Sequence, residues 1–258
     1  MPTLKLTVAY DGTRYAGWQR QSGSAGARPT VQETLERALG TILRERVRVV
    51  GSGRTDAGVH ALAQVAHARV AKPVSCARLR RSLQALLPGD LAVLRVEEAA
   101  KDFHARFDAK EKRYRYRIFT GPVPDPFARP YVHHVRAPLN AARMRREAAA
   151  LRGRHDFRAL ARAGHGRRST VRVIRSVGLR RRGEELWLEV IGSGFLHAMV
   201  RSIAGTLIDV GRGRLPAGTL PQLLRAGRRG GAGTTAPARG LVLVSVRYRE
   251  GRHERARD

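Results

Sequence analysis

Residues 53–60 (GRTDAGVH) are the part of this chain whose residue types and spacing best suit chemistry. Asp56 stands there among small residues, two positions after Arg54, in a protein that is otherwise very basic. A nearby cation favours the ionised form of a carboxyl group, so we expect Asp56 to be charged. Glycines at positions 51 and 53 allow a sharp turn and the close approach of a large substrate. The loop therefore predicts a reactive carboxylate that a substrate can reach.

The overall charge predicts a polyanionic partner. Lysine and arginine together number 50 against 21 acidic residues, a formal net charge of +29. Five are lysines, which leaves 50 − 5 = 45 arginines, and a guanidinium group donates paired hydrogen bonds to phosphate oxygens. A GC-rich genome also replaces lysine by arginine, but it does not explain the net charge. We expect nucleic acid, bound mainly through its backbone because aromatic residues make up only 5%.

Sequence motifs for nucleotide cofactors and metals are missing. Residues 51–56 begin like a dinucleotide-binding fingerprint but have Asp56 where its last glycine is required, and no phosphate-loop motif occurs. The nine histidines form no His-Glu-x-x-His pair, and Cys76 is the single cysteine. We therefore expect no metal and no nucleotide cofactor. With neither a signal peptide nor an apolar run of about 18 residues, a soluble, cytoplasmic protein without a membrane segment is expected.

Alternating strands and helices are predicted to position Asp56 in the first half of the chain. Alternation of apolar residues predicts strands near 4–8, 47–50, 61–70 and 91–98. The capping box at 30–33 (TVQE) and apolar residues at helical spacing predict a helix of about three turns, and a second helix is expected at 77–87. Residues 53–60 then form a loop between two strands.

The second half is predicted to repeat this order. A strand at 110–119 has arginines on one face and Tyr114 with other aromatic or apolar residues on the other. A proline-rich stretch follows, then a helix (140–151), strands near 170–180 and 185–191, helices at 195–211 and 219–226, and a last strand at 241–248. The recurrence indicates a duplicated α/β unit whose sheets join and leave a cleft between two lobes.

The motif around Asp56 resembles the signature of the catalytic aspartate in the TruA family of tRNA pseudouridine synthases. Further blocks typical of that family follow the same order along the chain. They are YDG at 10–12 with GWQR at 17–20, LPGD at 87–90, DFHARF at 102–107, KRYRY at 112–116, and FLHAMVR at 195–201. With residues 53–60 these make six collinear blocks between residues 10 and 201, and the resemblance extends to the final strand through 240–243.

The resemblance implies isomerisation of uridine to pseudouridine at positions 38, 39 and 40 in the anticodon stem-loop of tRNA, without a cofactor. Asp56 corresponds to the catalytic nucleophile, with a turn or cap aspartate as the alternative. Arg54 corresponds to the residue that holds the target nucleotide out of its stack, with an ion pair to Asp56 as the simpler interpretation. Tyr114 corresponds to the active-site tyrosine, with core packing as the alternative. Arg201 is expected to pair with Asp56, unless its head group extends into solvent.

Two further segments match regions that contact tRNA in the family. They are Phe103, His104, Ala105, Arg106 and Phe107, and Gly164, His165, Gly166, Arg167 and Arg168. Solvated loops are the alternative for each. Val74 and Pro122 fall where relatives carry tRNA-binding arginines, so the contact map is expected to be redistributed.

The implied fold is α/β (α+β), with mixed, mainly antiparallel sheets flanked by helices around a central basic cleft. We expect an N-terminal lobe at 1–108, a C-terminal lobe at 109–249 and a disordered charged tail at 250–258, and by analogy a homodimer. Two rival functions remain. One is a non-enzymatic RNA-binding protein or RNA chaperone, and the other is a synthase that modifies other uridines.

Overall fold

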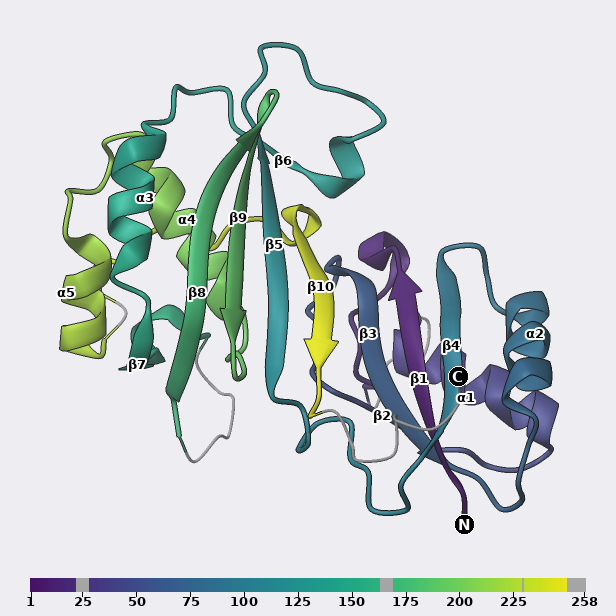
Figure 1. Cartoon of the computed structure of the whole chain (residues 1–258). Coiled ribbons are helices and arrows are strands. Elements are labelled where there is room, and N and C mark those ends of the chain that lie inside the picture. Colours follow the sequence, from purple (N-terminus) through teal and green to yellow (C-terminus); the bar gives the residue numbers. More distant parts are fainter. Residues whose placement is uncertain (22–27, 163–168, 229, 250–258) are drawn as a thin grey trace, which may run out of the picture.

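The computed structural model describes residues 1–21, 28–162, 169–228 and 230–249. Within these ranges the strands form one sheet in the order β4-β1-β3-β10-β5-β9-β8-β7, with β2 paired to β3 and β6 paired to β5 (Figure 1). The strands are β1 Thr3–Tyr10, β2 Val49–Gly51, β3 His60–Arg69, β4 Leu91–Ala99, β5 Glu111–Phe119, β6 His133–His134, β7 Gly153–Asp156, β8 Val171–Arg182, β9 Glu185–Gly192 and β10 Leu241–Arg247.

Helices flank both ends of this sheet (Figure 1). Helices α1 (Val31–Leu43) and α2 (Cys76–Leu86) lie at the β1–β4 end, and α2 contacts β4. Helices α3 (Ala141–Ala149), α4 (Met199–Gly211) and α5 (Thr219–Ala226) lie at the other end, where α3 contacts β8 and α4 contacts β5. Together with the mainly antiparallel pairing, this arrangement confirms the predicted α/β fold class.

Strand β10 joins the two halves of the chain. It pairs in parallel with β3, whose residues directly follow the Asp56 loop, and antiparallel with β5. The last strand of the chain therefore lies in the middle of the sheet (Figure 1). The sheets of the two halves are continuous, as predicted, whereas the lobe boundary between residues 108 and 109 stays a prediction.

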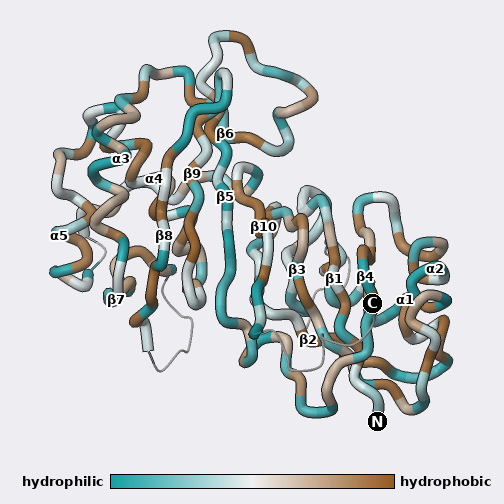
Figure 2. Tube along the Cα trace, in the orientation of Figure 1, coloured by the Kyte–Doolittle hydropathy of each residue, from teal (hydrophilic) through white to brown (hydrophobic). Residues whose placement is uncertain are grey.

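Strand β5 separates two chemically different faces of the sheet. Figure 2 shows that most of this strand is hydrophilic along its length. Its even-numbered residues Lys112, Tyr114, Tyr116 and Ile118 are nevertheless buried. On the other face, Arg113 and Arg115 both bind Glu189, and Arg117 binds Glu185. Successive side chains of a strand point to opposite faces, so the predicted division between a basic and an aromatic face is confirmed.

Helix α4 begins later than its sequence pattern predicts. The expected helix spans 195–211, but α4 starts at Met199 because Ala198 has a left-handed backbone with φ of 57°. The preceding turn is closed by a hydrogen bond from the Met199 amide to the Leu196 carbonyl. Apolar spacing continues through this turn, so periodicity alone does not reveal the break. The short strands β6 and β7 were also not predicted.

The segment 233–236 packs tightly against α4. The Thr234 amide donates to Asp209, and the Gly233 amide donates to the Thr206 hydroxyl. A Cβ atom added at Gly205 would lie 1.6 Å from the Thr234 carbonyl oxygen, so only glycine permits this contact.

We predict that Gly205→Ala destabilises the protein by about 1–3 kcal/mol, because the added methyl group forces the two backbones apart. This is the net loss after the gain of about 1 kcal/mol from the higher helix propensity of alanine. Urea denaturation measures the effect. The matched control is Gly178→Ala in β8, where an added Cβ meets nothing within 4 Å. Equal stability of the two variants would contradict the close approach.

Candidate active site

Asp56 lies in the loop between β2 and β3, and its side chain is 19% exposed. The loop turns back through a hydrogen bond of 3.1 Å from the Val59 amide to the Asp56 carbonyl. Two cationic or titratable side chains approach the carboxylate from the second half of the chain. Nη1 of Arg201 donates to Oδ2 at 2.8 Å, and Nε2 of His197 lies 3.4 Å from Oδ1. The carboxylate is thus partly shielded but still reachable.

Both the backbone and the side chain of Arg201 are hydrogen-bonded to Ala236. Its Nε donates to the Ala236 carbonyl at 2.9 Å, and the Ala236 amide donates to the Arg201 carbonyl at 3.1 Å. Its side chain is 21% exposed. The predicted contact between Arg201 and Asp56 is therefore confirmed, and the alternative of a head group extended into solvent is wrong.

Polar side chains from three strands fix the loop that carries Asp56. Gln64 of β3 donates to the Gly53 carbonyl and accepts from the Ser52 hydroxyl. Lys112 of β5 donates to the Ser52 carbonyl. The Tyr10 hydroxyl of β1 shares a hydrogen bond of 2.8 Å with Thr55, and burial raises the pKa of Tyr10 to about 12, so this group stays neutral. The loop is therefore anchored to both halves of the sheet.

A second segment packs on the same loop through a glycine. Gly17 has φ of 98°, and a Cβ atom there would lie 2.6 Å from the Thr55 carbonyl oxygen. Next to it, the Trp18 amide donates to that same oxygen at 3.1 Å. Only glycine accommodates both the positive φ and the close approach. The GWQR block at 17–20 thus supports the backbone immediately before Asp56.

Arg54 binds Gln19 rather than Asp56. Its side chain is exposed, and its Nε donates to Gln19 at 3.2 Å. No ion pair between Arg54 and Asp56 occurs in the part of the chain that the structure describes. The interpretation of Arg54 as the ion partner of Asp56 is therefore wrong. Arg201 takes that place, and Arg54 is an exposed residue of the same loop as Asp56.

Tyr114 faces the side of the sheet that carries α4. It is 6% exposed, and its ring meets Phe195 edge to face, with centroids 5.0 Å apart. Phe195 stands two residues before His197, in the turn that leads to α4. Farther along β5, the Tyr116 hydroxyl donates to the Pro237 carbonyl, next to the residue that anchors Arg201. Tyr114 is therefore packed, and it is packed against the segment that supplies His197.

The segment 103–107 combines buried and exposed residues. Ala105 is buried; its amide donates to His67, and its carbonyl accepts from Tyr248. Phe103 packs on the Tyr248 ring, and the Nδ1 of His104 accepts backbone hydrogen bonds from Arg106 and Phe107. Arg106 and Phe107 are exposed, Phe107 by 71%. Only these last two present side chains to a partner, while the first three hold the loop in shape.

Arg106 lies in an electropositive neighbourhood. Burial, together with the charge of Arg106, lowers the pKa of Arg172 at the start of β8. Neither arginine forms an ion pair with an acid within residues 1–21, 28–162, 169–228 and 230–249. A pair of guanidinium groups without a carboxylate partner suits a phosphate. Gly164, His165, Gly166, Arg167 and Arg168 lie outside the described residues, as does the tail at 250–258.

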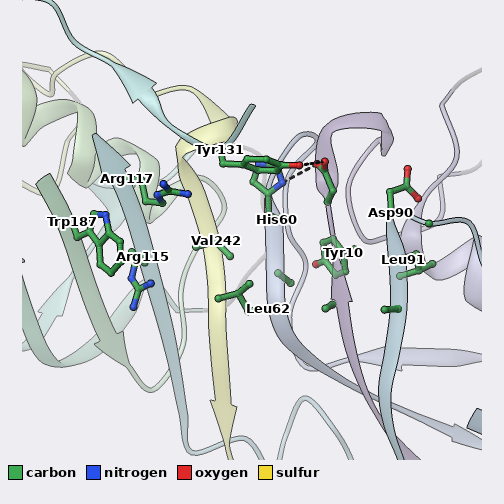
Figure 3. Close-up of a pocket in the computed structure, with 15 residues that line it drawn as sticks. Tyr10, His60, Leu62, Asp90, Leu91, Arg115, Arg117, Tyr131, Trp187 and Val242 are labelled. Carbon is green, nitrogen blue, oxygen red and sulfur yellow. Dashed lines mark hydrogen bonds and ion pairs between the residues drawn. The ribbon is translucent and has the colours of Figure 1, made fainter. Parts of the chain in front are cut away.

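The cavity in Figure 3 is separate from Asp56. It has a volume of about 540 Å³ and lies on the face that carries Arg115 and Arg117. Leu62 and Val242 lie between these arginines and the opposite wall at Asp90 and Leu91 (Figure 3). Asp56, Tyr114 and Arg201 do not line it. It therefore belongs to the opposite face of β5.

The described residues contain no cluster of three or more histidine, cysteine, aspartate or glutamate side chains that could hold a metal ion. None of their helices has the length and apolar character that a membrane span requires.

The sequence predicts no role for His197, although the residue lies within the FLHAMVR block. The available signal is its position four residues before Arg201, which places both side chains on one face of a continuous helix. Periodicity alone does not indicate what such a histidine contacts. The supporting roles of Gln64 and Lys112 carry no comparable sequence signal.

The chain is similar to known proteins over most of its length. A family model described as tRNA pseudouridine synthase matches residues 6–108 and 148–249. Proteins named tRNA pseudouridine synthase A match 96% of this chain and 100% of their own length, at 45% identity in Moorella thermoacetica, 46% in Solibacter usitatus and 45% in Pelobacter propionicus. A chain of a solved Cbf5-Nop10-Gar1 complex is similar in structure, with a TM-score of 0.36 and 13% sequence identity. The match covers 93% of this chain and 47% of that chain. The chain belongs to the tRNA pseudouridine synthase A family.

Proposed function

We propose that this protein isomerises uridine to pseudouridine at positions 38, 39 and 40 of the tRNA anticodon stem-loop, with Asp56 as the nucleophile and without a cofactor. The observation that carries the proposal is the carboxylate of Asp56, held at 2.8 Å by Arg201 in a loop fixed from both halves of the sheet. A carboxylate oriented by a neighbouring guanidinium suits nucleophilic catalysis. Membership of the family supports the tRNA substrate.

The reaction balances without a redox partner. The bond between ribose C1′ and uracil N1 breaks, a bond between C1′ and C5 forms, the proton on C5 leaves, and N1 gains one. Asp56 attacks the uridine and leaves again when the base is rejoined, so it is regenerated in each turnover. Arg201 stabilises the carboxylate each time it becomes free. No electron acceptor and no energy source enters these steps.

Two further residues act on the target nucleotide. A uridine in the anticodon stem must leave its stack before chemistry. The exposed Arg54, beside the catalytic loop, holds the nucleotide out of the helix. Tyr114 contacts the uracil through the aromatic surface that its ring forms together with Phe195.

The remainder of the substrate is bound through charge. Arg106 and Phe107 are exposed on one loop, and Arg106 acts together with Arg172 as a phosphate-binding pair. Residues 164–168 are proposed to contact tRNA by family analogy alone. We further propose a homodimer, so that one tRNA contacts both subunits, and a cytoplasmic location, where tRNA is modified. Because binding rests on arginine–phosphate contacts, affinity falls steeply as salt rises.

Mapping pseudouridine in an unmodified tRNA transcript incubated with the protein tests the function. We expect product at positions 38–40 alone and none in the untreated transcript. Product elsewhere in tRNA would favour a synthase of other specificity. Binding without product would favour a non-enzymatic RNA-binding protein.

We predict that Arg54→Ala slows conversion of folded tRNA by roughly 10- to 100-fold, because extrusion of a stacked base costs a few kcal/mol. The thermal midpoint should stay near that of the wild type, since the Arg54 side chain is exposed and, among the described residues, its hydrogen bond is to Gln19. Single-turnover rates and thermal unfolding measure the two effects. Arg37→Ala, at an exposed position of α1, is the matched control. Wild-type turnover of the folded variant Arg54→Ala would exclude the role.

A further inference from the structure

The two oxygens of the Asp56 carboxylate have different partners. Oδ2 accepts a hydrogen bond of 2.8 Å from Arg201. Oδ1 lies 3.4 Å from Nε2 of His197, a longer approach that meets the distance for an ion pair but is not a short hydrogen bond. The carboxylate is thus held firmly on one side and loosely on the other.

Arg201 cannot leave its oxygen without other losses. Its Nε is bound to the Ala236 carbonyl, and its own carbonyl is bound by the Ala236 amide. Its backbone belongs to α4, which packs closely on residues 233–236. Separating a partly buried ion pair leaves an uncompensated charge. Oδ2 is therefore the more firmly held oxygen and the poorer candidate for bonding to a substrate.

His197 is different in exposure and in support. Its side chain is 42% exposed, twice the fraction of Arg201. Its carbonyl accepts a hydrogen bond of 3.0 Å from the Arg162 amide, which fixes the backbone but not the imidazole. A rotation of the side chain would free Oδ1 without breaking any backbone contact.

The backbone beside His197 is held in an uncommon conformation. Ala198 has φ of 57°, one of two positive values at non-glycine residues among those that the structure describes. Such a conformation costs an alanine about 1–2 kcal/mol and tends to occur where function requires it. Here it ends the turn before α4, so that His197 and Arg201 reach the same carboxylate from one segment.

We propose that His197 is a further catalytic residue, which holds Oδ1 of Asp56 in the free enzyme and yields it to the incoming uridine. Oδ1 is then the oxygen that reacts, while Oδ2 stays with Arg201. The displaced imidazole stays beside the reacting atoms, where its N–H donates a hydrogen bond to the negative charge that develops on the uracil as the glycosidic bond breaks. This inference rests on the proposed function of Asp56 as the nucleophile.

The test compares His197→Ala and His197→Gln with the wild type. Glutamine keeps an N–H donor at about the position of Nε2, whereas alanine removes it. We expect His197→Ala to lower kcat by about 10- to 100-fold, the range for a hydrogen bond to a charged group, with KM for tRNA and the thermal midpoint near wild-type values. His197→Gln should restore most of kcat. His155→Ala, which removes a histidine bound to the Arg152 carbonyl, is the control.

Five outcomes would overturn the proposal. Unchanged kcat in His197→Ala would remove the residue from the chemistry. A rise in KM with unchanged kcat would make it an RNA contact only, and a parallel loss of thermal stability would make it structural. Equal rates for the alanine and glutamine variants would show that an N–H donor beside the reacting atoms is not what matters. A wild-type protein that forms no pseudouridine would overturn the proposed function and this inference together.

Discussion

The ion pair between Asp56 and Arg201 is the interaction on which the rest of the site depends. One partner comes from the loop between β2 and β3, and the other comes from α4, 145 residues later in the chain. At 2.8 Å and with both side chains about one-fifth exposed, the pair is shielded enough that losing either partner is costly. The pair can form only if the two halves of the sheet are held in register. Strand β10 provides this by pairing with both β3 and β5.

The surrounding contacts hold the loop that carries Asp56 in place. Gln64, Lys112 and Tyr10 bind the loop before Asp56, and Gly17 lets a second segment pack on it.

The basic residues behind the net charge of +29 are not all equally available to bind a polyanion. On the far face of β5, glutamates neutralise the arginines, whereas Arg54 and Arg106 form no ion pair with an acid among the described residues. Electrostatic attraction for a polyanion is therefore strongest where arginines lack such partners.

Much of this fold follows from local sequence patterns, and the exceptions share a physical cause. Alternation and capping predict most strands and helices to within a few residues, because apolar periodicity reflects burial directly. The pairing of Asp56 with Arg201 was predicted from the family blocks and the need of a guanidinium for an anion. The late start of α4 depends on one left-handed residue, Ala198, which is not encoded by periodicity. The central place of β10, the contact of Arg54 with Gln19 and the approach of His197 to Asp56 arise between distant segments, which a single sequence does not reveal.

The central claim is that the negative charge at residue 56 performs the chemistry. The most direct measurement is the single-turnover rate of Asp56→Asn on an unmodified tRNA transcript, together with its tRNA affinity. The amide has nearly the same shape but neither the charge nor the nucleophilic oxygen. We expect no detectable pseudouridine from this variant, with tRNA affinity within a fewfold of the wild type. Formation of pseudouridine at the wild-type rate would contradict the account.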